Sequence, residues 1–283
     1  ATTTGCSPAS TTSTTTGVIS IDGPVISTAE LDRQLALFRD VAGMEVRSDE
    51  HLPSRTAHAL FGTQDREARL VALATPGSRI GVWLVEFSPH SDTVIRVGGV
   101  GVATDALKMV DVFTRDRVAA IARVKSQGFE FVSEGADVTL PDGGRFIEAH
   151  VRGPDGVMFA VIEALNLPAS QFVSVTDRLF SEVQSTSAPV SDFEPVRHFY
   201  EQVLGVPLGF RYEFESESFS KMVGTKDTIR IRANNYGRVV DDVMLGIIHY
   251  GLPPGSYESL RERAQPPHRG VVGVRLEVRG LDA

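Results

Sequence analysis

The stretch at residues 191–210, SDFEPVRHFYEQVLGVPLGF, decides the fold, because it predicts a helix leading into a strand and recurs along the chain. Its apolar residues follow the i, i+3, i+4, i+7, i+8 spacing of one helix face; they are Val196, Phe199, Tyr200, Val203 and Leu204. Pro195 suits a first helical turn, and Gly205 stands where helices commonly end in the left-handed conformation. The stretch is therefore typical of a surface helix packed on a core.

A second segment, AELDRQLALFRDVAGMEV, begins at residue 29 and aligns with the stretch from residue 191 at one constant offset, without a gap. The offset pairs Leu37 with Phe199 and Gly43 with Gly205. A looser copy, TRDRVAAIARVKSQGFEFV, begins at Thr114, and the final EVRGLDA is similar to the start of a fourth. Such repetition indicates modules that bury their apolar faces against one another.

Composition narrows the class of protein. With 283 residues, 42% hydrophobic and 23% charged, the chain has room for two globular domains. A net charge of −8 without a polybasic run argues against a nucleic-acid surface. No stretch approaches the ~20 apolar residues that span a bilayer. We therefore expect no nucleic-acid partner.

The first 17 residues, ATTTGCSPASTTSTTTG, are rich in Ser and Thr and predict a disordered leader. Cys6 is the only cysteine, which excludes an internal disulfide. Gly5-Cys6 and the hydroxyl-rich tether resemble the end of a bacterial lipoprotein signal, although Thr3 stands where such signals usually have Leu. A lipid anchor on Cys6, and with it a cell-envelope location, stays open beside a cytoplasmic one.

After the leader, a predicted strand (GVISIDGPVIS) and the first helix precede four further predicted strands, within MEVRSD, RTAHALFG, ARLVALAT and RIGVWLVEF. The second copy ends in HVRGPDGVMFAVIEAL, where Asp155-Gly156 is a hairpin turn signal before a buried strand. The third ends in DVMLGIIHYGLPPG. Each copy thus predicts one helix and several strands.

This pattern resembles the vicinal oxygen chelate superfamily, which contains glyoxalase I, bleomycin-resistance proteins and extradiol dioxygenases. The segments VSDFEPVRHFYEQVLGVPL and GPDGVMFAVIEAL carry the resemblance. It implies an α+β fold of tandem βαβββ modules that form cupped mixed sheets with helices outside. We expect one domain of two modules at residues 18–166, and an incomplete one at 167–283 with module three and the start of a fourth. A homodimer stays open.

In metal-using members of the superfamily, a His or Gln in the first strand and a Glu in the last strand of paired modules hold a divalent ion. Family spacing places the first-strand positions on residues that supply no imidazole, namely Gly23, Met109, Ser185 and Gly273. The resemblance therefore predicts no cofactor and no metal, although a divalent ion held by carboxylates alone stays open. Ser185 and Gly273 also argue against extradiol dioxygenase chemistry.

Glu86 and Glu163 are the last-strand carboxylates, and we expect them to face each other in the first cup. Each follows an apolar run, where burial raises a carboxyl pKa and suits it to general-base work. The alternative is a solvated or Arg-paired position at the strand end. His249, Arg230 and Arg232 are candidate substrate-binding residues, since cations on one strand face can receive an anionic ligand; a solvated sheet face is the alternative.

Two function classes follow from the resemblance, and both imply a small-molecule ligand. One is a glyoxalase-like enzyme of the lyase or isomerase type, in which Glu86 or Glu163 moves a proton. The other is a non-catalytic protein that sequesters a small molecule, as in the bleomycin-resistance branch. Whether the chain is an enzyme stays undecided at this level.

Overall fold

The computed structural model describes residues 17–97, 101–133, 135–166, 177–239, 241–253 and 255–279. Residues 1–16 of the predicted leader, Cys6 among them, lie outside these ranges, and Gly17 already begins a strand. Within the described residues, no helix has both the length and the apolar character that a membrane span requires.

The first sheet has five strands in the order β13-β1-β4-β3-β2. One face is covered by α1 (Leu31–Leu35), which continues as the π-helical η1 (Ala36–Val41). The other face is covered by α2 (Ser54–Phe61). The strands are β1 Gly17–Ser27, β2 Glu45–Leu52, β3 Glu67–Ala74, β4 Gly81–Ser88 and β13 Gly270–Arg279.

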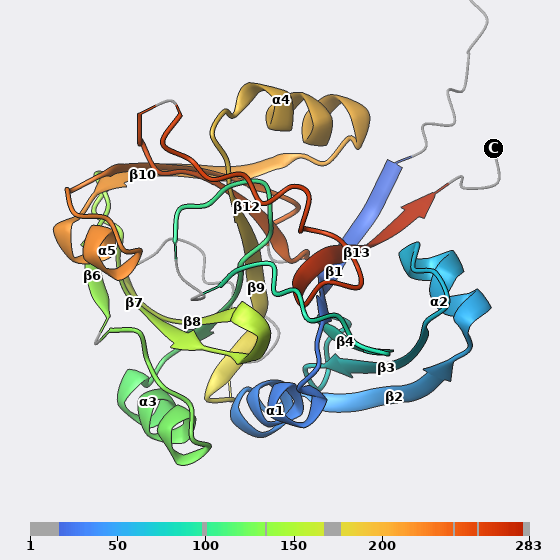
Figure 1. Ribbon diagram of the computed structural model, residues 1–283. Coiled ribbons are helices and arrows are strands. Elements are labelled where there is room, and N and C mark those ends of the chain that lie inside the picture. Colours follow the sequence, from blue (N-terminus) through green and yellow to red (C-terminus); the bar gives the residue numbers. More distant parts are fainter. Residues whose placement is uncertain are drawn as a thin grey trace, which may run out of the picture.

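The second sheet has eight strands in the order β10-β11-β12-β9-β5-β8-β7-β6. Figure 1 shows it curled, with α5 beside β6 and below β10 at the open side, and with α3 and α4 outside. The strands are β5 Met109–Thr114, β6 Ala136–Thr139, β7 Arg145–Arg152, β8 Met158–Asn166, β9 Phe180–Pro189, β10 Leu208–Glu215, β11 Arg230–Tyr236 and β12 Met244–His249. The helices are α3 Arg117–Ser126, the 3-10 turn η2 Pro154–Gly156, α4 Glu194–Arg197 with its π-helical continuation η3 His198–Val203, and α5 Glu217–Met222.

The two ends of the eight-stranded sheet approach each other. The rings of Phe146 on β7 and Phe214 on β10 lie 6.1 Å apart. Between the sheet ends, α5 contributes Phe219 and Met222 to the same apolar cluster. The sheet is therefore curled nearly into a barrel, and this cluster fills the interior where its two ends approach.

The expected fold class is confirmed: the chain is α+β, built from repeated modules with helices outside the sheets. The helices expected at 29–42, 115–127 and 192–204 are present. Both aligned helices also change to π-helix at equivalent positions, Ala36–Val41 in one and His198–Val203 in the other. The repeat in sequence is thus a repeat in backbone geometry.

The expected pairing of modules is wrong. We expected the modules within residues 18–166 to share one sheet, but β5 of the second module pairs with β9 of the third, and β1 pairs with β13. In both sheets the first strand of one module lies antiparallel to the first strand of another. The repeat in sequence is consistent with antiparallel pairing of two first strands, but it does not indicate which modules pair.

The segment RTAHALFG is also corrected, since it forms helix α2 and not a strand. Pro53 precedes the helix, and Gly62 ends it in the left-handed conformation with φ 69°. Ala57 and Phe61 pack on the sheet. Pro53 and Gly62 are helix start and stop signals. The strand prediction relied on the short apolar run and did not take them into account.

Leu37 and Phe199 are aligned in sequence, but their environments differ. Leu37 is fully buried, whereas Phe199 is 47% exposed. A Cβ on Gly153 would lie 3.1 Å from Leu37 Cδ2, so η1 is packed against the second module as well as its own sheet. The corresponding side of η3 faces solvent at Phe199 and Val203.

Candidate functional site in the curled sheet

The eight-stranded sheet has two chemically distinct faces. Val110 and Val112 of β5 pack in one cluster with Ala120 and Val124 of α3, so their side chains point outward. Met109 belongs to a separate cluster with Met158 and Ala160 of β8. Because strand residues alternate between faces, Met109 and Asp111 lie on the side away from α3, which we call the inner face.

Polar residues form a row across this apolar inner face. We call them the polar band: Asp111 on β5, Glu148 and His150 on β7, Ser185 and Ser187 on β9, and Asn235 on β11. The strand register aligns them as His150, Ala160, Asp111 and Ser185 in one line, and as Ser187, Gly246 and Asn235 in the next. The band therefore crosses the six central strands.

Small residues interrupt the band at two points. Ala160 separates His150 from Asp111, and Gly246 separates Ser187 from Asn235. A Cβ on Gly246 would lie 3.2 Å from both Asn235 Oδ1 and Ser187 Cβ. Glycine thus lets these two side chains approach each other over the strand.

Asp111 lies at the centre of the band and is 8% exposed. Ser185 donates a hydrogen bond from Oγ to Asp111 Oδ2. Asp111 Oδ1 has no hydrogen-bond partner among the residues that the structure describes. Burial, reinforced by the negative charge of Glu148, raises the pKa of Asp111 to about 7. This carboxyl group can therefore gain or lose a proton near neutral pH.

His150 and Glu148 form a buried pair. His150 is completely buried, and its Nε2 lies 2.6 Å from Glu148 Oε1. With the Nε2 proton donated to the carboxylate, Nδ1 presents a lone pair. Nδ1 has no hydrogen-bond partner within the described part of the chain. The carboxylate thus orients an imidazole whose Nδ1 is free to accept a hydrogen bond.

Lys108 and Tyr250 add a second buried pair to the same interior. Lys108 directly precedes β5, is 1% exposed, and donates a hydrogen bond from Nζ to Tyr250 Oη. Burial, together with the nearby positive charge of Arg96, lowers the pKa of Lys108 to about 8, against the attraction of Glu148 and Asp111. Burial also raises the pKa of the Tyr250 phenol. Lys108 is thus electrostatically coupled to the band.

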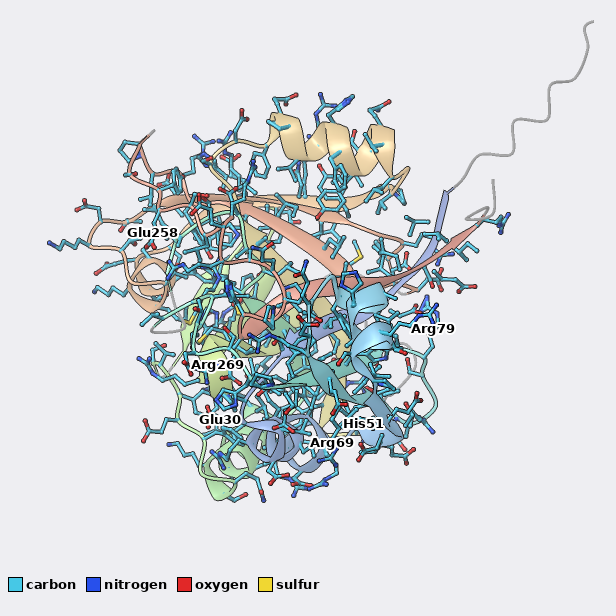
Figure 2. The ribbon with its side chains drawn as sticks, turned by 45° about the vertical axis from the view of Figure 1, so that its right-hand side comes forward. Glu30, His51, Arg69, Arg79, Glu258 and Arg269 are labelled. Atoms are coloured by element: carbon cyan, nitrogen blue, oxygen red, sulfur yellow. The ribbon has the colours of Figure 1, made fainter. Side chains whose placement is uncertain are left out.

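Glu86 and Glu163 do not face each other, and the expectation that they do is wrong. Glu86 lies on β4 of the five-stranded sheet and pairs in register with Arg69. Glu86 shares its strand face with Leu84, which packs with α1. Figure 2 shows Arg69 beside His51, its register partner on β2.

Glu163 lies on β8 of the other sheet, an odd number of residues from Ala160 and therefore on its outer face. Its carboxylate lies 3.5 Å from Arg117 Nε of α3. Glu86 and Glu163 thus belong to separate sheets, and each occupies a helix-covered face. The Arg-paired alternative describes Glu163.

The structure brings His249 and Arg232 together, with His249 Nδ1 3.4 Å from Arg232 Nη2. Arg232 lies over the Phe193 ring, 5.5 Å from its centroid, and Arg230 forms an ion pair with Glu213. Arg230 and Arg232 are exposed, on the strand face opposite the inner residues Ile231 and Ala233. These three residues are therefore separate from the polar band.

The sequence carried a signal for the band that our interpretation missed. MVDVF has one acidic residue inside an apolar strand, two positions after Met109 and hence on the same face. IEAHV places Glu148 and His150 two apart in another apolar strand. A polar residue repeated at the strand period, inside a strand that is otherwise buried, indicates an interior site better than a carboxylate at a strand end.

The inner face does not provide the expected donors for a transition metal. Met109 and Ser185 both lie on it, but they offer a thioether and a hydroxyl where imidazoles would be needed. Across the described residues, no three His, Cys, Asp or Glu side chains are grouped so as to hold a metal ion. The donor set therefore does not fit the metal centre described for the vicinal oxygen chelate superfamily.

Two surface cavities lie away from the band. One, of about 510 Å³, is lined by Arg197, Glu201 and Arg211 between η3 and β10; the other, of about 200 Å³, lies where η1 ends near Phe180. The larger one is polar, but Arg197 is already paired with Glu194 and Glu201. The buried unpaired atoms of the band are the stronger indication of a ligand site.

The fold has relatives among solved structures. No protein-family model matches the chain, and no curated protein sequence matches it. Glyoxalase I from Zea mays is 17% identical over 84% of this chain and 69% of that one, with a TM-score of 0.53. A candidate dioxygenase from Bacillus subtilis is 9% identical over 94% of this chain and 71% of that one, with a TM-score of 0.50. At such identities the likeness establishes only that the chain shares the fold of these two proteins.

Proposed function

We propose that the chain binds a small carbonyl compound on the inner face of the eight-stranded sheet and transfers a proton on it, as a lyase or isomerase does. One observation carries the proposal: Asp111 and His150 lie on either side of Ala160, both buried, and each has one polar atom without a partner among the described residues. Adjacent strands lie ~4.8 Å apart, so the Cβ atoms of the two residues are separated by roughly 10 Å. A small substrate over Ala160 can reach both.

The two groups have complementary roles in this proposal. Asp111 removes a proton from the carbon next to the substrate carbonyl, since a carboxyl group with a pKa near neutrality is an efficient general base. His150, oriented by Glu148, exchanges a proton with the substrate oxygen on the other side. The hydrogen bond from Ser185 holds Asp111 in place.

A binding protein without turnover is the second candidate, and the apolar lining favours it. The aromatic side chains of Phe214 on β10, Phe219 on α5 and Tyr250 after β12 lie in one apolar cluster. Phe214 and Phe219 form an edge-to-face pair with centroids 5.2 Å apart. Such a surface can hold an apolar or aromatic ligand through burial alone.

Hydrogen exchange on the substrate tests the proposal. The protein is incubated in D₂O with dihydroxyacetone, acetoin or the hemithioacetal of methylglyoxal and glutathione, and exchange at the carbon beside the carbonyl is followed by proton NMR. We expect exchange above the buffer rate with at least one probe, and a loss of on the order of 10²–10⁴-fold in Asp111→Asn.

The matched control is Glu163→Gln, the same carboxylate-to-amide change on the outer face against Arg117. We expect this variant to retain the exchange rate. Equal rates for Asp111→Asn and the original protein would refute the role of Asp111. A probe that raises the melting temperature without any exchange would instead support the binding protein.

A further inference from the structure

Lys108 is a buried amine that the proposed proton transfer does not use. Its side chain enters the apolar interior of the curled sheet and ends on the Tyr250 hydroxyl, with Nζ 5.0 Å from the Tyr250 ring centroid. Lysine is almost never fully buried unless it is paired with an acid. Here the hydrogen-bond partner of the amine is a neutral phenol, while Asp111 and Glu148 act on the amine through their charge.

The electrostatic surroundings oppose a charged amine at this position. The Arg96 guanidinium, also buried, donates hydrogen bonds to the carbonyl oxygens of Ala103 and Ala106, and its charge acts on Lys108. With a pKa of about 8, about a quarter of the Lys108 amines are neutral at pH 7.5, against about one in a thousand for an ordinary lysine. Only the neutral amine is a nucleophile.

Tyr250 supplies the matching acid. Burial raises the pKa of its phenol, so the hydroxyl stays protonated at neutral pH. The Tyr250 hydroxyl group contacts Lys108 Nζ. When the amine attacks a carbonyl compound, the carbonyl oxygen would therefore also lie close to this hydroxyl group. An amine and a proton donor in contact inside an apolar interior are the groups that imine formation requires.

We propose that Lys108 forms an imine with small aldehydes or ketones that enter the curled sheet, with Tyr250 as the proton donor. The amine nitrogen forms a bond to the carbonyl carbon while Tyr250 protonates the carbonyl oxygen, which gives a carbinolamine. The nitrogen loses a proton, which returns to the tyrosinate. A second proton transfer from Tyr250 then lets the hydroxyl group leave as water, and loss of the last nitrogen proton restores Tyr250. The amine and the carbonyl compound thus become an imine and one water.

This inference rests on the proposed function only in using the same interior for the ligand. A carbonyl compound held as an imine at Lys108 has a more acidic adjacent carbon, which Asp111 could deprotonate. The imine itself requires Lys108 and Tyr250 but not Asp111. The two proposals can therefore fail separately.

Reductive trapping tests the inference on the native protein. Propionaldehyde or benzaldehyde is added at pH 7.5 with sodium cyanoborohydride, which reduces the imine to a stable secondary amine. Peptide mass spectrometry then measures the modified fraction at each lysine. The other lysines, Lys125, Lys221 and Lys226, are all exposed and act as internal controls.

We expect at least tenfold faster modification at Lys108 than at the exposed lysines, and we expect urea unfolding to abolish the difference. Tyr250→Phe should slow modification at Lys108 and leave the exposed lysines unchanged. Modification of Lys108 at or below the rate of the exposed lysines in the folded protein would overturn the inference. Trapping at Lys108 in a protein that shows no deuterium exchange would support the imine and contradict the proton transfer.

Discussion

Replacing Asp111 with asparagine should make the protein more stable at neutral pH. The pKa of Asp111 is raised from the ordinary 3.8 to about 7, chiefly by burial, so folding favours the protonated carboxyl group. Below pH 3.8 the group is protonated in both states and contributes no pH dependence. As the pH rises from there, the unfolded chain ionises first and its free energy falls relative to the folded state.

The loss of stability is complete once the folded carboxyl group also ionises, near pH 7. The interval from 3.8 to about 7 corresponds to about 4 kcal/mol. Asparagine keeps the shape and still accepts the Ser185 hydrogen bond, but it does not titrate. The advantage of Asp111→Asn over the original protein should therefore grow by about 3 kcal/mol between pH 4 and pH 7, and approach about 4 kcal/mol at higher pH.

Urea unfolding at half-unit pH steps from 4.0 to 7.5 measures this difference. Glu148 and Lys108 act on Asp111 through their charges, and both are present in the original protein and in the variant. Glu163→Gln gives the background for the same chemical change beside Arg117. A difference between Asp111→Asn and the original protein that stays flat, or that shrinks as the pH rises, would refute the raised pKa and the reasoning built on it.

Three further predictions concern backbone strain at two glycines, the charge of Lys108 and the dependence of exchange on metal. Gly156→Ala should lower the free energy of unfolding by more than ~2 kcal/mol, because φ is 73° and the new Cβ would lie 2.1 Å from the Arg96 carbonyl oxygen. Gly62→Ala is the matched control, with φ 69° and open space around the new Cβ, and should lower it by about 1 kcal/mol. Urea titration measures both. Lys108→Met should be more stable than the original protein below pH 8 by about 3 kcal/mol, because the folded pKa lies below 10.5; the gain should disappear between pH 8 and 10.5, where the folded lysine is already neutral. EDTA treatment should leave the deuterium exchange rate unchanged, and a loss that Zn²⁺ or Mn²⁺ restores would contradict the metal-free route.

The sequence predicted the modules because their helices repeat at one offset, and the π turns of η1 and η3 show that the backbone follows this offset closely. The partner of each module was not predictable, because β1 and β5 are both first strands that pair antiparallel with the first strand of another module. Nothing in this shared pattern says which module the partner is. The burial of the aligned helix residues was not predictable for the same reason. Leu37 and Phe199 occupy equivalent positions on equivalent helices, but only η1 is covered by another module.

The site was predictable only through strand parity. Glu163 stands three residues after Ala160, so it must point to the opposite face of β8. The resemblance singled out Glu163 as a last-strand carboxylate without considering the face of the strand on which it lies. Asp111 shares the phase of Met109, which the family spacing had placed in the cup. What the sequence could not show is the contact between Asp111 and Ser185, since it depends on which modules pair.

The stability and exchange experiments on Asp111 together separate a functional cluster from a structural one. A polar network that holds a fold together loses stability when one member is changed, because a buried partner is left unpaired. The ionisable groups of the curled sheet should behave in the opposite way, since Asp111 and Lys108 are both held in surroundings that disfavour their charged forms. Asp111→Asn should therefore raise stability at pH 7 while it abolishes exchange. That combination is expected where a site is kept at the expense of stability; a variant that loses both would show that the band is part of the scaffold.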